Sequence, residues 1–101
     1  MTFEDLESSV LDWARDRGIL QNGTPVSQLL KAVSELGELC DAEGKKNKVA
    51  IQDGIGDVLV CLINYAALHG LRPVDCLLLA YCQIRDRKGW LMPDGTFVKE
   101  G

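Results

Sequence analysis

The sequence contains a single histidine, His69, and its four cysteines form no CxxC pair. A di-iron helical bundle takes Glu-x-x-His motifs from two of its helices, so one histidine excludes that class of site. The cysteines lie within apolar segments, which favours reduced thiols in a helical core of a cytosolic protein. They are Cys40, Cys61, Cys76 and Cys82.

Basic residues are the minority, with 11 lysines and arginines against 15 acidic residues and a formal net charge of −4. This balance disfavours a broad nucleic-acid-binding surface. The N-terminus lacks the charged and apolar regions of a signal peptide. The most apolar stretch, about residues 55 to 68, is short for a bilayer span and contains Asp57 and Asn64. We expect a cytoplasmic protein with no membrane or nucleic-acid partner.

Repeats, long linkers and strand patterns are also nearly absent. Helix start signals occur at Thr2, at Thr24-Pro25 and at Pro73, and glycines follow most of the helical segments. The sequence predicts helices over about residues 2–17, 25–43, 49–69 and 73–88. A chain of 101 residues fits one domain. We therefore expect a single all-α domain, a four-helix bundle, with a short irregular C-terminal tail containing the turn Pro93-Asp94-Gly95.

The chain is 47% hydrophobic, with long apolar runs in the third and fourth predicted helices. A short bundle does not easily cover that much apolar surface by itself. We expect a homo-oligomer, a dimer or a tetramer, to cover the remainder.

Two acidic residues, Glu35 and Glu38, share one face of the second predicted helix with Gln28 and Lys31. Residues three and four apart lie on the same side of a helix. Taken alone, this face has the pattern of a solvated surface with alternating charges. The opposite side carries an apolar stripe that we expect to face the core, made of Leu29, Val33, Leu36 and Cys40.

The third predicted helix is apolar almost all round, yet Asp53, Asp57 and Asn64 form a narrow polar stripe on it. An apolar helix of this kind is expected to be buried, and a buried carboxylate needs a partner. One candidate partner is a cation, since Asp57 beside Glu35 and Glu38 would repel them without one. All-oxygen ligands suit magnesium or manganese. The alternative is a salt bridge from Asp57 to Lys31 or Arg85.

Two segments, Val33-Ser34-Glu35-Leu36-Gly37-Glu38-Leu39 and Asp53-Gly54-Ile55-Gly56-Asp57-Val58-Leu59-Val60, resemble the MazG-like nucleotide pyrophosphohydrolases. These belong to the all-α nucleoside triphosphate pyrophosphatase superfamily, whose pattern is E-E-x-x-E, a spacer and E-x-x-D. The segments 83–89 and 94–100 also resemble small single-domain members. Two positions depart from the pattern, because Ser34 and Gly54 stand where it has glutamate. Asp53 lies beside Gly54 as its substitute.

The resemblance implies hydrolysis of a nucleoside triphosphate to the monophosphate and pyrophosphate by water attack at the α-phosphorus. It implies magnesium, or manganese, held by Glu35, Glu38, Asp57 and Asp53. Glu35 or Glu38 would also orient the water. Two other functions stay open. One is a related phosphoribosyl-ATP pyrophosphatase, and the other is a non-catalytic helical adaptor.

Five further residues are candidates for substrate binding: Lys31, Asn64, Arg85, Lys88 and Trp13. The three cationic residues could bind phosphate, the Asn64 amide could read a base or sugar, and the Trp13 ring could stack on a base. Each has a structural alternative. Lys31 could pair with Glu35, Arg85 and Lys88 could complement a helix dipole, Asn64 could be a satisfied buried amide, and Trp13 could pack in the core.

Overall fold

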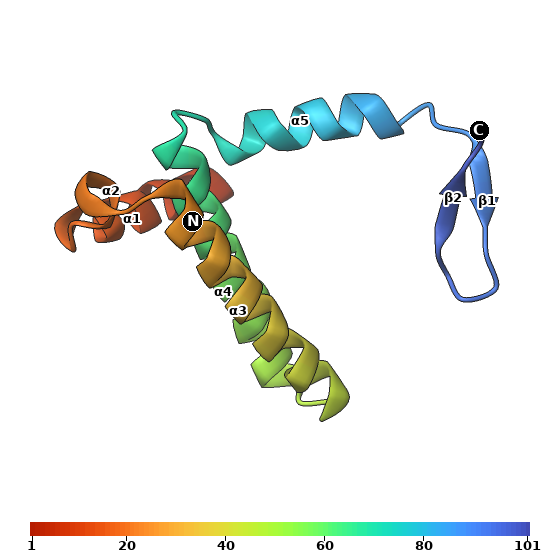
Figure 1. Cartoon of the computed structure of the whole chain (residues 1–101), viewed down its shortest axis with the longest axis horizontal. Coiled ribbons are helices and arrows are strands. Elements are labelled where there is room, and N and C mark those ends of the chain that lie inside the picture. The colour runs from red at the N-terminus through yellow and green to blue at the C-terminus, as the bar shows by residue number, and fades with distance from the viewer.

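The computed structural model describes residues 1–101 and contains five helices and one small sheet (Figure 1). Most of the chain is helical, as the sequence predicts. The elements are α1 (Phe3–Asp16), α2 (Ile19–Asn22), α3 (Pro25–Gly44), α4 (Lys48–Leu68), α5 (Pro73–Ile84), β1 (Gly89–Leu91) and β2 (Phe97–Lys99).

The helix starts are set by the capping residues that the sequence predicts. Thr2 and Asp5 form a reciprocal capping box before α1, and the Thr24 side chain accepts from the backbone of Ser27 at the start of α3. The turn between α3 and α4 differs from expectation. Gly44 continues α3, and Lys46 takes the positive φ of 52° at this turn. The short helix α2 lies within a segment for which the sequence predicted no helix.

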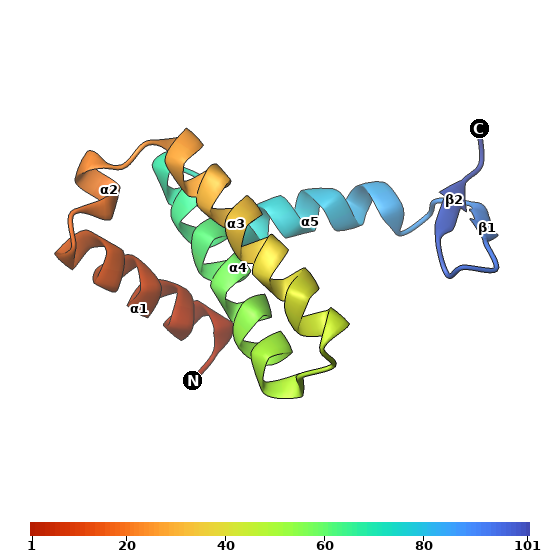
Figure 2. The same cartoon turned by 60° about the horizontal axis from the view of Figure 1, so that its bottom comes forward.

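The antiparallel pair α3 and α4 forms the centre of the molecule, and α1 packs against α4 (Figure 2). The two central helices approach closely at Gly54, because a Cβ there would lie 3.0 Å from Leu39 Cδ1 and 3.3 Å from Leu39 Cβ. The side of α3 that faces α4 carries Ala32 and Glu35, both buried.

The predicted orientation of α3 is therefore wrong. Its apolar stripe points outward, with Val33 62% and Leu36 50% exposed. The small side chain of Ala32 permits α3 to approach α4 closely on this side. On α4, an adjoining apolar strip is also about half-exposed, formed by Ile55, Leu59 and Leu62. We call these residues of α3 and α4 the outer apolar face: Leu29, Leu30, Val33, Leu36, Ile55, Leu59 and Leu62.

One chain does not close the predicted four-helix bundle. Helix α5 packs only against α4, near their junction, and then extends away from the other helices (Figures 1 and 2). Its leucines remain exposed, with Leu77 70% exposed. The reason is that the three-residue link after His69 turns α5 across α4 rather than alongside it. A bundle with α5 as its fourth member needs a contribution from outside this chain.

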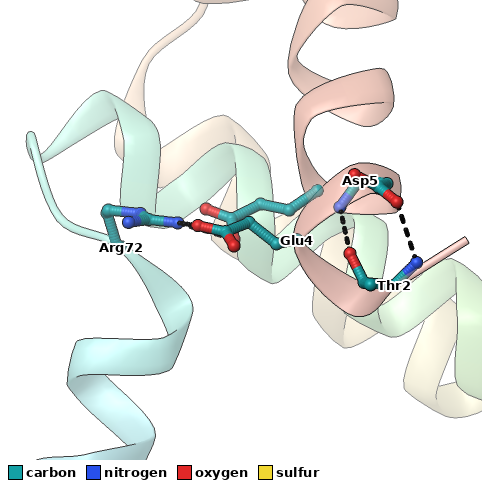
Figure 3. Close-up of polar contacts among 5 residues, drawn as sticks. Thr2, Glu4, Asp5 and Arg72 are labelled. Atoms are coloured by element: carbon teal, nitrogen blue, oxygen red, sulfur yellow. Dashed lines mark hydrogen bonds and ion pairs between the residues drawn. The ribbon is translucent and has the colours of Figure 1, made fainter.

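The N-terminal end of α5 is tied to α1 by ion pairs of Arg72. Its guanidinium donates to Glu4 Oε1 at 3.2 Å (Figure 3). It also lies 3.5 Å from Glu7 Oε2, whose side chain is almost fully buried. These carboxylates raise the pKa of Arg72, the hydrogen bond with Glu4 having the largest effect. The pairs fix the corner between α1, α4 and α5.

The C-terminal tail is not irregular, because residues 89–99 form an antiparallel hairpin. Trp90 pairs with Val98, and Leu91 with Phe97, around a turn where Gly95 has φ of 90°. The Asp94 carboxylate accepts from the backbone N–H of Thr96 at 2.9 Å, which lowers the pKa of Asp94. The sequence did signal the turn. The flanking strands have only three residues each, too few to show an alternating pattern.

Helix α4 is longer than the apolar stretch predicted for it. By length and composition alone it could cross a membrane, a test that the core helix of a soluble protein also passes.

Only one of the four cysteines, Cys61, is buried; all four are free thiols. The prediction that the cysteines lie in the core is thus wrong for Cys40, Cys76 and Cys82, which lie on outward-facing positions of α3 and α5.

Candidate active site

Four carboxylates from the two central helices come together on one side of the pair, and we call them the acidic site: Glu35 and Glu38 from α3, Asp53 and Asp57 from α4. Glu35 is the most enclosed of them, since it faces α4. Glu38 lies one turn further along α3. The hydrogen bond and then the negative charge of Glu35 raise the pKa of Glu38. The two carboxylates therefore lie close enough for their negative charges to repel each other.

Asp57 on α4 interacts electrostatically both with Asp53 on its own helix and with Glu35 on α3. It is half-buried, and its pKa is raised first by desolvation, then by the charges of Asp53 and Glu35. The predicted alternative, an ion pair from Asp57 to Lys31 or Arg85, is not formed; Lys31 pairs with Glu35 instead, at 3.1 Å. The acidic site therefore carries an excess of negative charge that the chain itself does not neutralise.

The donor chemistry of the acidic site fits a hard divalent ion, because every donor is a carboxylate oxygen. No three of the histidine, cysteine, aspartate and glutamate side chains are gathered tightly enough to hold an ion as they stand. Side-chain rotation is thus needed to close the site, and Glu35 must release Lys31 to use both of its oxygens. The pKa values of Glu38 and Asp57 are raised in part by repulsion from neighbouring carboxylates. A bound cation would relieve that repulsion, which also fits a metal ion at this site.

Asn64 lies two turns beyond Asp57 on the same side of α4 and is 2% exposed. Its Oδ1 atom is buried and has no hydrogen-bond partner. The sequence-based alternative of a satisfied buried amide therefore does not hold for this atom. Buried amide oxygens are normally paired, so Asn64 has an acceptor to offer. Cys61 lies between Asn64 and Asp57; burial and the charge of Glu35 raise its pKa, so the thiol stays protonated.

Trp13 lies beside the acidic site and not in the core. A shallow pocket between α1 and α4 is lined by Leu6, Ser9, Val10, Trp13, Asp57 and Val60. The Arg17 guanidinium lies 4.8 Å from the centre of the indole ring. The sequence predicted Trp13 as a stacking residue but not Leu6 and Val10 beside it. Their spacing places all three residues on one side of α1, which was the available signal.

Arg85 and Lys88 are not brought to the acidic site of their own chain. Helix α5 ends at Ile84, so both residues lie beyond it, and α5 has carried them away from α3 (Figure 2). The predicted end of this helix at about Lys88 is wrong. Arg85 instead pairs with Asp86 at 3.4 Å, and Lys88 contributes to a polar pocket between the end of α5 and the end of the hairpin.

The chain is similar to a known protein in sequence and to a solved structure in fold. No protein-family model matches the chain. Over 63 residues, 62% of its length, the chain is 35% identical to an 18.2 kDa protein from the rep–hol intergenic region of Haemophilus phage HP1. The chain spans 39% of the length of that relative.

The structure is similar over the whole chain to the cyanophage S-2L MazG-like pyrophosphohydrolase, with a TM-score of 0.75 and 18% identity. The similarity covers 99% of the cyanophage chain, which was solved with dGDP and three catalytic Mn²⁺ ions per active site. At this level of identity the comparison establishes the fold. The fold that the resemblance implies is thus confirmed: this chain has the fold of a MazG-like pyrophosphohydrolase.

Proposed function

We propose that this protein is a nucleotide pyrophosphohydrolase that converts a nucleoside triphosphate, ribo or deoxy, to the monophosphate and pyrophosphate in the cytoplasm. One observation carries the proposal: two pairs of carboxylates from α3 and α4 meet at one site in a fold shared with a MazG-like pyrophosphohydrolase. A helical adaptor has no need of these acids at a packed helix interface.

The proposed metal ligands are Glu35, Glu38, Asp53 and Asp57, and the proposed ion is Mg²⁺ or Mn²⁺. When bound, the ion would neutralise phosphate oxygens and lower the pKa of a water molecule. Of the two glutamates, Glu38 is the better placed to orient the attacking water at the α-phosphorus. It is more exposed than Glu35, and its raised pKa suits a group that accepts a proton.

The substrate would lie between the acidic site and α1. Lys31 is exposed beside Glu35 and could bind a phosphate oxygen. The unpaired Oδ1 of Asn64 could accept an N–H from a base or an O–H from a sugar. One face of Trp13 is covered by Arg17, so a base would stack on the remaining face or edge in the pocket next to Asp57.

We further propose that the active form is a homodimer, or a tetramer built from such dimers. The outer apolar face lies on the side of α3 away from the acidic site, about 150° round the helix at 100° per residue. Exposed apolar surface of this kind is typical of an interface. Helix α5 spans about 18 Å at 1.5 Å per residue, more than the roughly 10 Å thickness of one helix layer. It could therefore carry Arg85 and Lys88 across to the acidic site of a second copy.

The deciding experiment is pyrophosphate release from a panel of ribo- and deoxynucleoside triphosphates, with Mg²⁺ and with Mn²⁺. Glu38→Gln and Asp57→Asn should abolish release, whereas Glu43→Gln, an exposed acid at the far end of α3, should not. Activity on phosphoribosyl-ATP alone would favour the related histidine-pathway enzyme. No release from any of these nucleotides would favour the adaptor.

A further inference from the structure

The Lys31–Glu35 ion pair is the only ion pair of the acidic site. Lys31 Nζ lies 3.1 Å from Glu35 Oε1, and the two ends of the pair differ sharply in environment. The lysine side chain is 60% exposed, while the glutamate side chain is 11% exposed. The cation is thus the solvent-exposed member of the pair, and the carboxylate is the buried one.

The influence of this ammonium extends beyond its direct partner. The positive charge of Lys31 also attracts the carboxylates of Glu38 and Asp57, in addition to its ion pair with Glu35. One positive charge therefore partly neutralises three of the four carboxylates. This is the electrostatic task that the proposed divalent ion would perform with two charges.

The ammonium and a divalent ion cannot both occupy this position. A metal ion on Glu35 Oε1 would take the lone pairs that now accept from Lys31, and the two cations would repel each other. Lys31 has a flexible four-carbon stem and an exposed head, so it can leave without disturbing the helix. On release the exposed ammonium is hydrated by water, and the incoming ion keeps the buried Glu35 carboxylate paired with a cation.

We propose that Lys31 is a displaceable counter-ion, which holds Glu35 in the metal-free protein, is released when the divalent ion binds, and then binds a phosphate of the nucleotide. This inference rests on the metal site of the proposed function. Its consequence is an exchange of partners: metal binding frees the lysine that the anionic substrate needs. The metal ion would therefore bind before the nucleotide, because only its binding frees the Lys31 ammonium for a phosphate.

The exchange predicts effects of opposite sign in a single variant. Lys31→Met removes the competitor for Glu35, so Mn²⁺ alone should bind more tightly than to wild type, by about 5-fold or more. The same variant should bind an α,β-methylene nucleoside triphosphate about 10-fold more weakly at saturating Mn²⁺, as expected for the loss of one charge-assisted hydrogen bond. Calorimetric titration measures both affinities without turnover.

Lys45→Met is the matched control, because it removes the same charge from an exposed position at the C-terminal end of α3. It should change both affinities by less than about 2-fold, since exposed charges at that distance are screened. Lys31→Gln should behave as Lys31→Met does, which separates the loss of charge from the loss of side-chain shape. Circular dichroism should show all variants folded, as the substituted side chains are exposed.

Each outcome separates this inference from the proposed function. If wild type binds Mn²⁺ and Lys31→Met binds it equally well, the counter-ion role is wrong and the metal site stands. If Lys31→Met weakens both metal and nucleotide binding, Lys31 supports the site structurally and is not displaced. Absence of Mn²⁺ binding to wild type would overturn the metal site itself, and the exchange with it.

Discussion

Replacing Gly54 by alanine tests how closely α3 and α4 approach beside the acidic site. Alanine favours a helix over glycine by about 1 kcal/mol. The new Cβ would, however, lie 3.0 Å from Leu39 Cδ1 and 3.3 Å from Leu39 Cβ, so Leu39 or the backbone must move by a few tenths of an ångström. Overpacking of this kind costs about 1–3 kcal/mol. We expect Gly54→Ala to change stability by between about zero and −2 kcal/mol.

Gly56→Ala in the same helix is the control, because nothing lies within 4 Å of the corresponding Cβ. It should gain the full helix preference of about 1 kcal/mol. The two variants should therefore differ by about 1–3 kcal/mol in urea unfolding at one protein concentration. In thermal unfolding each kcal/mol corresponds to roughly 4–8 °C. Equal stabilisation by both substitutions would refute the close approach of the two helices.

Three further predictions follow from the acidic site and the outer apolar face. In the metal-free protein the raised pKa values of Asp57 and Glu38 mean that the folded state binds protons that the unfolded chain has lost. The melting temperature should therefore rise as the pH falls from 7 towards about 5, and Asp57→Asn should reduce that slope. Adding Mn²⁺ at pH 7 should raise the melting temperature of wild type but not of Asp57→Asn, as measured by calorimetry. Val33→Lys on the outer apolar face should produce monomers in light scattering, whereas wild type at micromolar concentration should not; a monomeric wild type would contradict the proposed dimer.

The starts of α1, α3 and α5 could be predicted from the sequence because they are marked by local chemistry. Thr2, Thr24 and Pro73 act within one turn of themselves, so no distant contact is needed to place them. The C-terminal hairpin could not be predicted in the same way. The hairpin is held by contacts between residues far apart in the sequence. Trp90 pairs with Val98, and the Lys88 carbonyl accepts from the Glu100 N–H.

The grouping of the acids could also be predicted, but for a reason that was only half right. Asp57 does lie next to Glu35, as the buried polar stripe indicated. The same reasoning placed Val33 and Leu36 in the core, and the structure exposes them. A helical wheel identifies two faces of a helix but does not say which one meets a neighbour in the same chain and which one is left for another molecule.

The contact between Gly54 and Leu39 also constrains the routes by which this sequence can change. Position 54 is where the family pattern has a glutamate, and any side chain there would enter the space that Leu39 now fills. A glutamate at 54 would therefore be better tolerated once residue 39, on a different helix, had become smaller. The two positions are thus coupled, so the effect of a substitution at one depends on the residue at the other. With Leu39 in place, an acid at position 53 is the nearest alternative open to the chain.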